Sequence, residues 1–282
     1  MAAAAKKKPT WQQVLLIAIV CTLCIMVLYP FWLLIVKSFK DYDQELESFL
    51  SLTLPLHFEN YLVAWDYVKG SILNSMFVSG MIAVTTVTLS AMGAYAFAMY
   101  SFKLKNLLFS ACVSLMMIPS ILTLSSKYIL VTVNLKLFNN FAGVILPQSA
   151  GLLPFGLLLL RGYFASIPKE LFEAADIDGA NSVYKFVKIM IPLTMSMLTT
   201  LLLMNFMTSW NDYLWPLMVL RDDTLFTIPI NLQSFTDRFY HMTNYYAPAL
   251  AGYVIVSIPL LFLFGFTSKQ FISGMTSGAF KM

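Results

Sequence analysis

The sequence is poor in charged residues. Only 11% of its 282 residues are Asp, Glu, Lys or Arg, whereas an average soluble domain has about 25%. So few charges cannot cover a water-exposed surface, which excludes a soluble globular protein. Residues of the set AVILMFWYC make up 59% of the chain, and its mean hydropathy is +0.75. The composition predicts an all-α polytopic membrane protein.

Cysteine and histidine are also scarce, with 3 Cys and 2 His in the chain. Cys21 and Cys24 have a C-x-x-C spacing, but no charged residue or His lies beside them to activate a thiol. His57 and His241 are solitary, so neither has a second ligand at metal spacing. We therefore expect no metal site, lipid-buried cysteines, and histidines in solvated loops.

Three further classes of protein are excluded. The 18 Lys and Arg are scattered singly among apolar runs, so no basic face forms for a nucleic acid. The G-x-x-x-x-G-K-[ST] loop is absent, so this chain does not itself bind a nucleotide. No nucleophile and base cluster within the apolar runs, which argues against a membrane-embedded enzyme. We expect no catalytic residue.

Long apolar runs supply about six transmembrane helices, because a bilayer core of about 30 Å needs roughly 20 apolar residues. The first run is too long for a signal peptide and is expected to be retained. Most Lys and Arg fall on the inner segments if residues 1–13 and the tail 268–282 are both cytoplasmic. Within the domain 14–267, the predicted spans are Val14 to Val36, Ile72 to Tyr100, Leu107 to Leu124, Phe141 to Leu160, Ile191 to Leu220 and Ala247 to Thr267.

The second predicted span carries a stripe of small side chains. Thr86, Ser90, Ala94 and Ala98 recur at four-residue spacing. Small residues let helix backbones approach closely in lipid. We predict that this stripe is a packing seam.

The fourth predicted span contains Pro147, Gly151, Pro154 and Gly156. Prolines at membrane depth free carbonyl groups that must face protein or a wet cavity. The pattern fits either a kinked helix beside a transport pathway or a merely bent packing helix.

The predicted inner loop 161–190 reads as two helices and a turn. Pro168 suits a first helical turn, Gly179 supplies the positive φ that ends a helix, and Asn181 or Ser182 can cap the next helix. Ala174 and Ala175 would leave a low surface on the first helix. The loop is therefore either a hairpin that inserts into a partner or an ordinary solvated connection.

The fifth predicted span contains Asp212, the one ionisable residue well inside an apolar run. An intramembrane acid is a candidate functional residue. Its neighbours Trp210, Asn211, Tyr213 and Trp215 add aromatic faces and an amide. This cluster suits a neutral polyol on a substrate pathway, or else an aromatic belt at the outer interface.

The inner loop also resembles a known family. Its run Glu173-Ala174-Ala175-Asp176-Ile177-Asp178-Gly179-Ala180 is similar to the EAA loop of membrane subunits of binding-protein-dependent ABC importers. The likeness covers roughly three quarters of the chain and is strongest to the second permease of maltose-type and oligosaccharide-type importers. Other motifs that carry it are Leu160 to Phe164, Ile167 to Leu171, Phe186, Ile189, Ile191-Pro192-Leu193, Asn74-Ser75, Ala94 to Ala98, Leu146-Pro147, Pro154-Phe155, Trp210-Asn211-Asp212 and Gly274 to Lys281.

The resemblance implies that the EAA loop is a coupling helix that docks in a groove of a cytoplasmic ATPase. By motif match, the coupling residues are Glu173, Ala174, Ala175, Asp178 and Gly179. Glu173 would make a charged contact or anchor the loop, the alanines would permit a close fit, and Gly179 would make the turn. The tail Ser273 to Met282 looks like the family segment that reaches the ATPase, with a frayed terminus as the alternative.

The resemblance also implies the partners and the function. They are a homologous second permease, two ATPase subunits that bind ATP and Mg²⁺, and an extracytoplasmic solute-binding protein, in a bacterial or archaeal cytoplasmic (inner) membrane. The chain would bind no cofactor directly. It would import a di- or oligosaccharide by alternating access. The alternatives are a permease for another solute, such as glycerol phosphate, and a self-contained secondary transporter.

Overall fold

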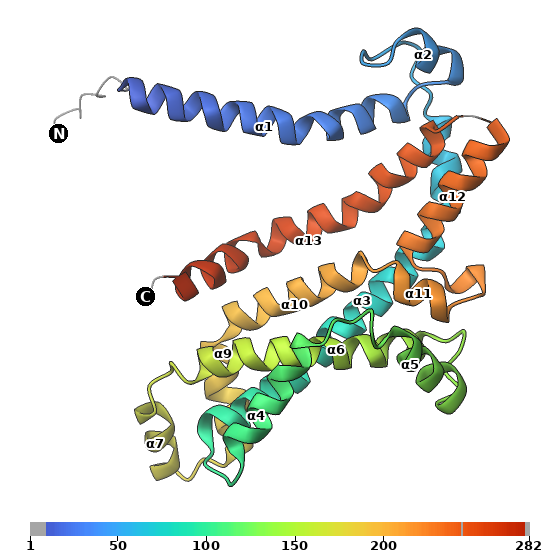
Figure 1. Cartoon of the computed structure of the whole chain (residues 1–282). Coiled ribbons are helices and arrows are strands. Elements are labelled where there is room, and N and C mark those ends of the chain that lie inside the picture. Colours follow the sequence, from blue (N-terminus) through green and yellow to red (C-terminus); the bar gives the residue numbers. More distant parts are fainter. Residues whose placement is uncertain (1–9, 244, 280–282) are drawn as a thin grey trace. The chain divides into compact units, whose positions relative to one another are not determined.

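The computed structural model describes residues 10–243 and 245–279, and their side chains except for 240–243 and 269–279. All secondary structure in these residues is helical, so the predicted all-α class is confirmed (Figure 1). The α-helices are α1 (Trp11–Ser38), α2 (Tyr42–Glu47), α3 (Glu59–Met99), α4 (Lys105–Ser114), α5 (Leu124–Ile129), α6 (Phe141–Phe164), α7 (Glu170–Ile177), α8 (Ser182–Tyr184), α9 (Ile191–Leu193), α10 (Met195–Trp210), α11 (Leu214–Val219), α12 (Ile228–Thr243) and α13 (Ala247–Ala279). The π-helices are η2 (Leu130–Asn134) and η3 (Lys185–Met190), and the 3-10 helices are η1 (Leu115–Met117) and η4 (Asp223–Leu225).

The chain divides into two compact units. The first contains Met1–Tyr67 and Ser234–Ser257, and the second contains Val68–Gln233 and Ile258–Met282. In the first unit, the ring of Tyr67 stacks on Phe235 with centroids 4.3 Å apart, and the side-chain amide of Asn60 donates to the carbonyls of Ser38 and Lys40 at 3.0 and 2.9 Å. The second unit contains the two candidate functional regions, which are the loop 161–190 and the segment around Asp212.

Close packing of α3, α6 and α10 forms the core of the second unit. Thr86, Ser90 and Ala94 are buried on α3, and the hydroxyl of Ser90 donates to the Leu153 carbonyl on α6 at 3.4 Å. A Cβ on Gly156 would lie only 2.4 Å from the Ser90 Oγ. The predicted packing seam is therefore confirmed, and Gly156 is the point on α6 that allows the close approach.

Helix lengths differ from the six expected spans. Among the described residues, α1, α3, α6 and Ala247–Ser268 of α13 are long and apolar enough to cross a membrane, and the bent pair Ser182–Leu193 and Met195–Trp210 adds a fifth if it is one span. Cys21 and Cys24 lie exposed on the apolar surface of α1.

The third expected span, residues 107–124, is not one helix, because its helical part ends at Met117. Pro119 follows, and the residue before a proline is driven out of the helical region. Ile118 accordingly has an extended conformation, with φ −83° and ψ 116°. At the other end of the chain, α13 continues to Ala279, well into the expected tail, and residues 1–9 and 280–282 lie outside the described set.

Candidate functional site

The loop between α6 and α10 begins as the helix and turn that its sequence predicts. α7 ends at Ile177 with Asp178 as its C-cap, and Gly179 has φ +76°. The Gly179 N–H donates to the Asp176 carbonyl at 3.1 Å, and the Ala180 N–H donates to the Ala175 carbonyl at 2.9 Å. These two bonds close the end of a helix around a residue of positive φ. The predicted turn at Gly179 is therefore confirmed.

The second arm of this hairpin (residues 170–190) is partly π-helical. The Asn181 side chain accepts from the Tyr184 N–H at 2.8 Å, as predicted for a cap. The chain then passes from α8 into the π-helix η3. Pro192 lies just beyond and has no N–H for the carbonyl of Lys188, so regular α-helical bonding cannot continue there.

A sharp bend separates this arm from α10. The segments Ser182–Leu193 and Met195–Trp210 meet at 79°. Thr194, which is fully buried at the bend, donates its hydroxyl to the Met190 carbonyl at 2.7 Å. A hydroxyl that bonds to the carbonyl four residues earlier promotes helix bending. The hairpin is thus joined to α10 at an angle.

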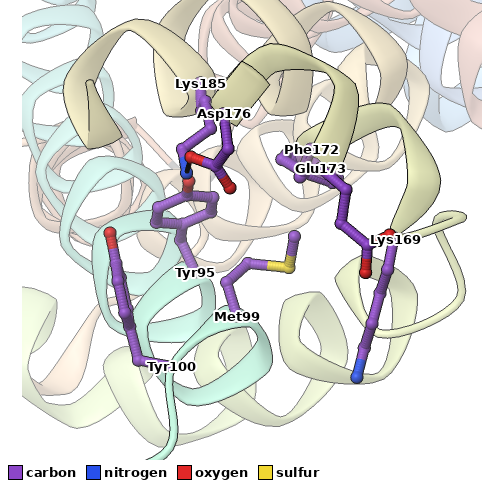
Figure 2. A pocket seen from close by; sticks show the side chains of 8 residues that line it. All are labelled: Tyr95, Met99, Tyr100, Lys169, Phe172, Glu173, Asp176 and Lys185. Carbon is purple, nitrogen blue, oxygen red and sulfur yellow. Dashed lines mark hydrogen bonds and ion pairs between the residues drawn. The ribbon is translucent and has the colours of Figure 1, made fainter. Parts of the chain in front are cut away.

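Aromatic side chains hold both arms of the hairpin against the C-terminal end of α3. Phe172 of α7 is buried in one core cluster with Tyr95 of α3. The ring of Phe186 on η3 packs on Tyr95 with centroids 5.1 Å apart. Between the arms and α3 is a cavity of about 170 Å³ (Figure 2), lined by Tyr95, Met99, Tyr100, Lys169, Phe172, Glu173, Asp176 and Lys185.

The structure divides the predicted coupling residues between two faces of the hairpin. Glu173, Ala174, Asp178 and Gly179 are exposed, whereas Ala175 is buried. The expectation that both alanines present a low outer surface is therefore met by Ala174 alone. Ala175 faces inward because it shares the buried side of α7 with Phe172.

The outer face also carries apolar residues that we did not predict. Ile177 is 88% exposed at the end of α7, and Val183 is 71% exposed on α8. Ile177 lies on α7 and Val183 on α8, so these exposed apolar side chains come from both arms of the hairpin. Ile177 could have been found in the sequence, because it is out of helical phase with Phe172 and Ala175.

The fifth expected span, Ile191 to Leu220, is interrupted where Asp212 occurs. α10 ends at Trp210 and α11 begins at Leu214. Pro216 explains this break, because a proline has no N–H for the carbonyl four residues earlier, which here belongs to Asp212, and its ring clashes with that carbonyl. Asp212 therefore lies in a break between two helices rather than in the middle of one.

Asp212 belongs to a polar network that joins three segments. The side-chain amide of Gln148 on α6 donates to the Asp212 carboxylate, and the hydroxyl of Ser209 donates to the Gln148 Oε1 at 3.1 Å. The Lys127 Nζ on α5 lies 3.9 Å from the ring centre of Trp215. Burial lowers the pKa of Lys127, and the charge of Asp212 opposes this shift. The Asp212 carboxylate is thus a hydrogen-bond acceptor of Gln148 at the break between α10 and α11.

The other predicted pathway residues have different surroundings. Trp210 is buried and stacks on Phe206 with ring centroids 5.5 Å apart. The amide of Asn211 donates to the Met207 carbonyl of its own helix at 2.7 Å. Tyr213 is exposed. Side-chain hydrogen bonds therefore join Asp212 to Gln148, and Gln148 to Ser209, rather than joining Asp212 to Trp210, Asn211 or Tyr213.

Pro147 has a structural role beside this network. Because a proline lacks an N–H, it frees the carbonyl four residues earlier, which is that of Gly143. The indole N–H of Trp215 donates to this carbonyl at 3.1 Å. The freed carbonyl is therefore satisfied by protein, which favours the packing interpretation at this end of α6.

Comparison with known proteins identifies relatives along the chain. The arabinooligosaccharides transport system permease protein AraQ of Bacillus subtilis is 32% identical, over 92% of each chain. The trehalose/maltose transport system permease protein MalG of Thermococcus litoralis is 29% identical, over 96% of this chain and 97% of that protein. A chain in the crystal structure of a bacterial ABC transporter involved in the import of the acidic polysaccharide alginate has a TM-score of 0.79 and 21% identity, with coverage of 94% and 99%, and so shares the fold.

Residues 87–275 match the family described as binding-protein-dependent transport system inner membrane component. This match includes the hairpin, the bend at Thr194 and the polar network of Asp212. The chain belongs to this family of transporter subunits, the permeases of ABC importers.

Proposed function

We propose that this chain is the permease subunit of an ATP-driven importer of a di- or oligosaccharide. The observation that carries the proposal is the hairpin. It has a tight turn and exposed apolar side chains, it packs on the core of the second unit, and it is joined to α10 at a sharp bend. The relatives named for arabinooligosaccharides and for trehalose and maltose support a sugar as cargo. Alternating access would then follow from movement of the hairpin relative to the spans.

The proposed complex contains a homologous second permease, two ATPase subunits and an extracytoplasmic solute-binding protein. It lies in the cytoplasmic (inner) membrane of a bacterium or archaeon, with both termini of this chain in the cytoplasm. The ATPase subunits bind ATP and Mg²⁺, while this chain carries the coupling residues Glu173, Ala174, Ala175, Asp178 and Gly179. The family supports this assembly, because its name describes a membrane component that depends on a binding protein.

Ala174, Ile177 and Val183 form the proposed ATPase-docking face. Apolar side chains as exposed as Ile177 and Val183 lose contact with water when a partner covers them, and that burial favours binding. The exposed carboxylates of Glu173 and Asp178 lie on the same projection and suit polar contacts at the rim of an interface.

Ile177→Asp is expected to weaken this docking, because it places a charge where an apolar contact forms. Recovery of the ATPase with the tagged permease should fall about tenfold, equivalent to about 1.4 kcal/mol. Leu46→Asp is the matched control, since Leu46 is 69% exposed on α2, outside the hairpin. Equal recovery of the ATPase with both variants would contradict the proposed face.

The network of Asp212, Gln148, Ser209 and Lys127 is the proposed contact with cargo, with Trp210, Asn211 and Tyr213 as its surroundings. Carboxylate, amide and hydroxyl groups exchange hydrogen bonds with sugar hydroxyls. The near absence of basic residues in the predicted spans favours an uncharged cargo over an anion. The break between α10 and α11 supports this role, because discontinuous helices place free backbone groups at a pathway.

Asp212→Asn is expected to reduce sugar uptake about tenfold, because it removes the charged hydrogen-bond acceptor of Gln148. Asp223→Asn, on the exposed helix η4, should leave uptake unchanged. Uptake of radiolabelled sugar by proteoliposomes, at equal ATPase content, measures the effect. If Asp212→Asn took up sugar at the wild-type rate, the proposal that this network contacts the cargo would be contradicted.

Reconstitution of the whole complex tests the proposed function. The ATPase activity of proteoliposomes would be measured with the binding protein and a panel of di- and oligosaccharides, and with glycerol phosphate. We expect a member of the sugar panel to stimulate hydrolysis and to accumulate. Stimulation by glycerol phosphate alone would assign another cargo, and accumulation by vesicles that contain only this chain would indicate a secondary transporter.

A further inference from the structure

An ion pair links the two arms of the hairpin. The Lys185 Nζ on η3 lies 2.5 Å from the Asp176 Oδ1 on α7. The Lys185 side chain is only 14% exposed, whereas that of Asp176 is 58% exposed. A lysine is rarely so covered without a partner. Lys185 is therefore held at a defined place between the arms rather than extended into water.

The surroundings of this pair connect it to α3. Asp176 and Lys185 line the cavity of Figure 2 together with Tyr95, near the end of α3, and Tyr100, just after it. The other charged groups that line the cavity are Lys169, which precedes α7, and Glu173 on α7. Opposite charges from the two arms thus meet beside the aromatic residues on which the hairpin packs.

The turn between the arms is not packed from outside. Gly179 is exposed, and a Cβ built on it would meet nothing within 4 Å. The backbone bonds that close the end of α7 fix the turn locally, but they do not set the distance between α7 and η3 farther along. The packing of Phe172 and Phe186 on Tyr95 holds each arm against α3, and the Asp176–Lys185 pair links the two arms directly.

We infer that Asp176 and Lys185 are positioning residues that hold α7 and η3 as one body. A displacement of α7 then reaches η3 and α10 instead of being absorbed by flexing at Gly179. This inference rests on the proposed function, because it assigns to the pair the transmission of ATPase movement to the spans. The pair is partly exposed, and such pairs add little to global stability, so its removal changes coupling while the fold persists.

Coupling in the reconstituted complex tests the inference. Asp176→Asn and Lys185→Gln should each retain normal membrane content and ATPase recovery, while sugar uptake per ATP hydrolysed falls about fivefold, equivalent to about 1 kcal/mol. The charge swap Asp176→Lys with Lys185→Asp should recover at least half of the lost ratio. Glu170→Gln, an exposed acid of the same helix, is the control and should behave as wild type.

A structural readout separates failure of the inference from failure of the proposed function. Spin labels at Leu171 on α7 and Val187 on η3, both exposed, report the distance between the arms in the full-length chain with Cys21, Cys24 and Cys112 replaced by Ser. We expect one narrow distance distribution in the otherwise unchanged chain. The distribution should broaden in Asp176→Asn and narrow again in the charge-swap variant Asp176→Lys with Lys185→Asp. An unchanged distribution in Asp176→Asn, or single variants with a wild-type uptake ratio, overturns the inference. Absence of sugar uptake by the wild-type complex, with the distances behaving as expected, instead overturns the sugar assignment.

Discussion

Gly179→Val is expected to abolish at least about nine tenths of transport while the protein remains in the membrane. Gly179 has φ +76°, and a left-handed conformation costs an L-residue roughly 1–2 kcal/mol, with β-branched residues affected most. Relief of this strain would open the turn and redirect α7, so that movement of the ATPase no longer reaches the spans. Uptake and ATP hydrolysis, measured on the same proteoliposomes, should separate, with hydrolysis retained.

Two matched variants show whether the backbone conformation is the cause. Gly179→Asn should retain most of the transport, because Asn tolerates the left-handed region. Gly162→Val adds the same side chain on α6, where a Cβ meets nothing within 4 Å, and should transport normally. Normal uptake by Gly179→Val would contradict both the role of the turn and the coupling role of the hairpin.

Gly156→Ala is expected to give the largest loss of stability. The new Cβ would lie 2.4 Å from the Oγ and 2.9 Å from the Cβ of Ser90, and 3.2 Å from the Cδ2 of Leu201. The Ser90 hydroxyl can rotate away, but its Cβ is fixed to the backbone of α3, so the helices must separate. Overpacking of this kind costs about 1–3 kcal/mol, which corresponds to a fall in Tm of about 3–10 °C in detergent.

The partner residue and the same helix supply the controls for this clash. Ser90→Gly removes both close atoms. The double variant Gly156→Ala with Ser90→Gly should therefore lose less stability than the sum of the losses in the two single variants. Gly151→Ala, on the same helix with nothing within 4 Å of its Cβ, should leave the Tm within about 1 °C. A Tm of Gly156→Ala equal to that of Gly151→Ala would show that the seam adapts.

The hairpin was predictable because its backbone geometry depends on single residues. A glycine with positive φ and an Asn cap act within a few residues of themselves, and both occur where the sequence indicated. The faces of α7 were harder to predict, because their burial depends on contact with α3. Ala175 and Ile177 are close in sequence, yet the bundle covers one and leaves the other exposed.

The spans and the Asp212 network show a different limit. Hydropathy finds apolar runs but does not register Pro119 and Pro216, whose missing N–H groups end helices inside two of these runs. Gln148 and Asp212 are 64 residues apart, so only the packing of α6 beside α10 brings them together. A sequence-local search therefore grouped Asp212 with Trp210 and Tyr213 and missed its hydrogen-bond partner.

In the proposed coupling mechanism, the 79° bend at Thr194 would determine the direction in which force acts on α10. A push along the axis of Ser182–Leu193 meets α10 nearly at right angles and so exerts a torque on it. α10 would tilt about its contacts with α6 instead of sliding along its own axis. The end of α10 beside Asp212 would then move in the direction opposite to the end at Thr194. A small displacement of the hairpin on one side of the membrane would therefore shift the segment around Asp212 on the other side.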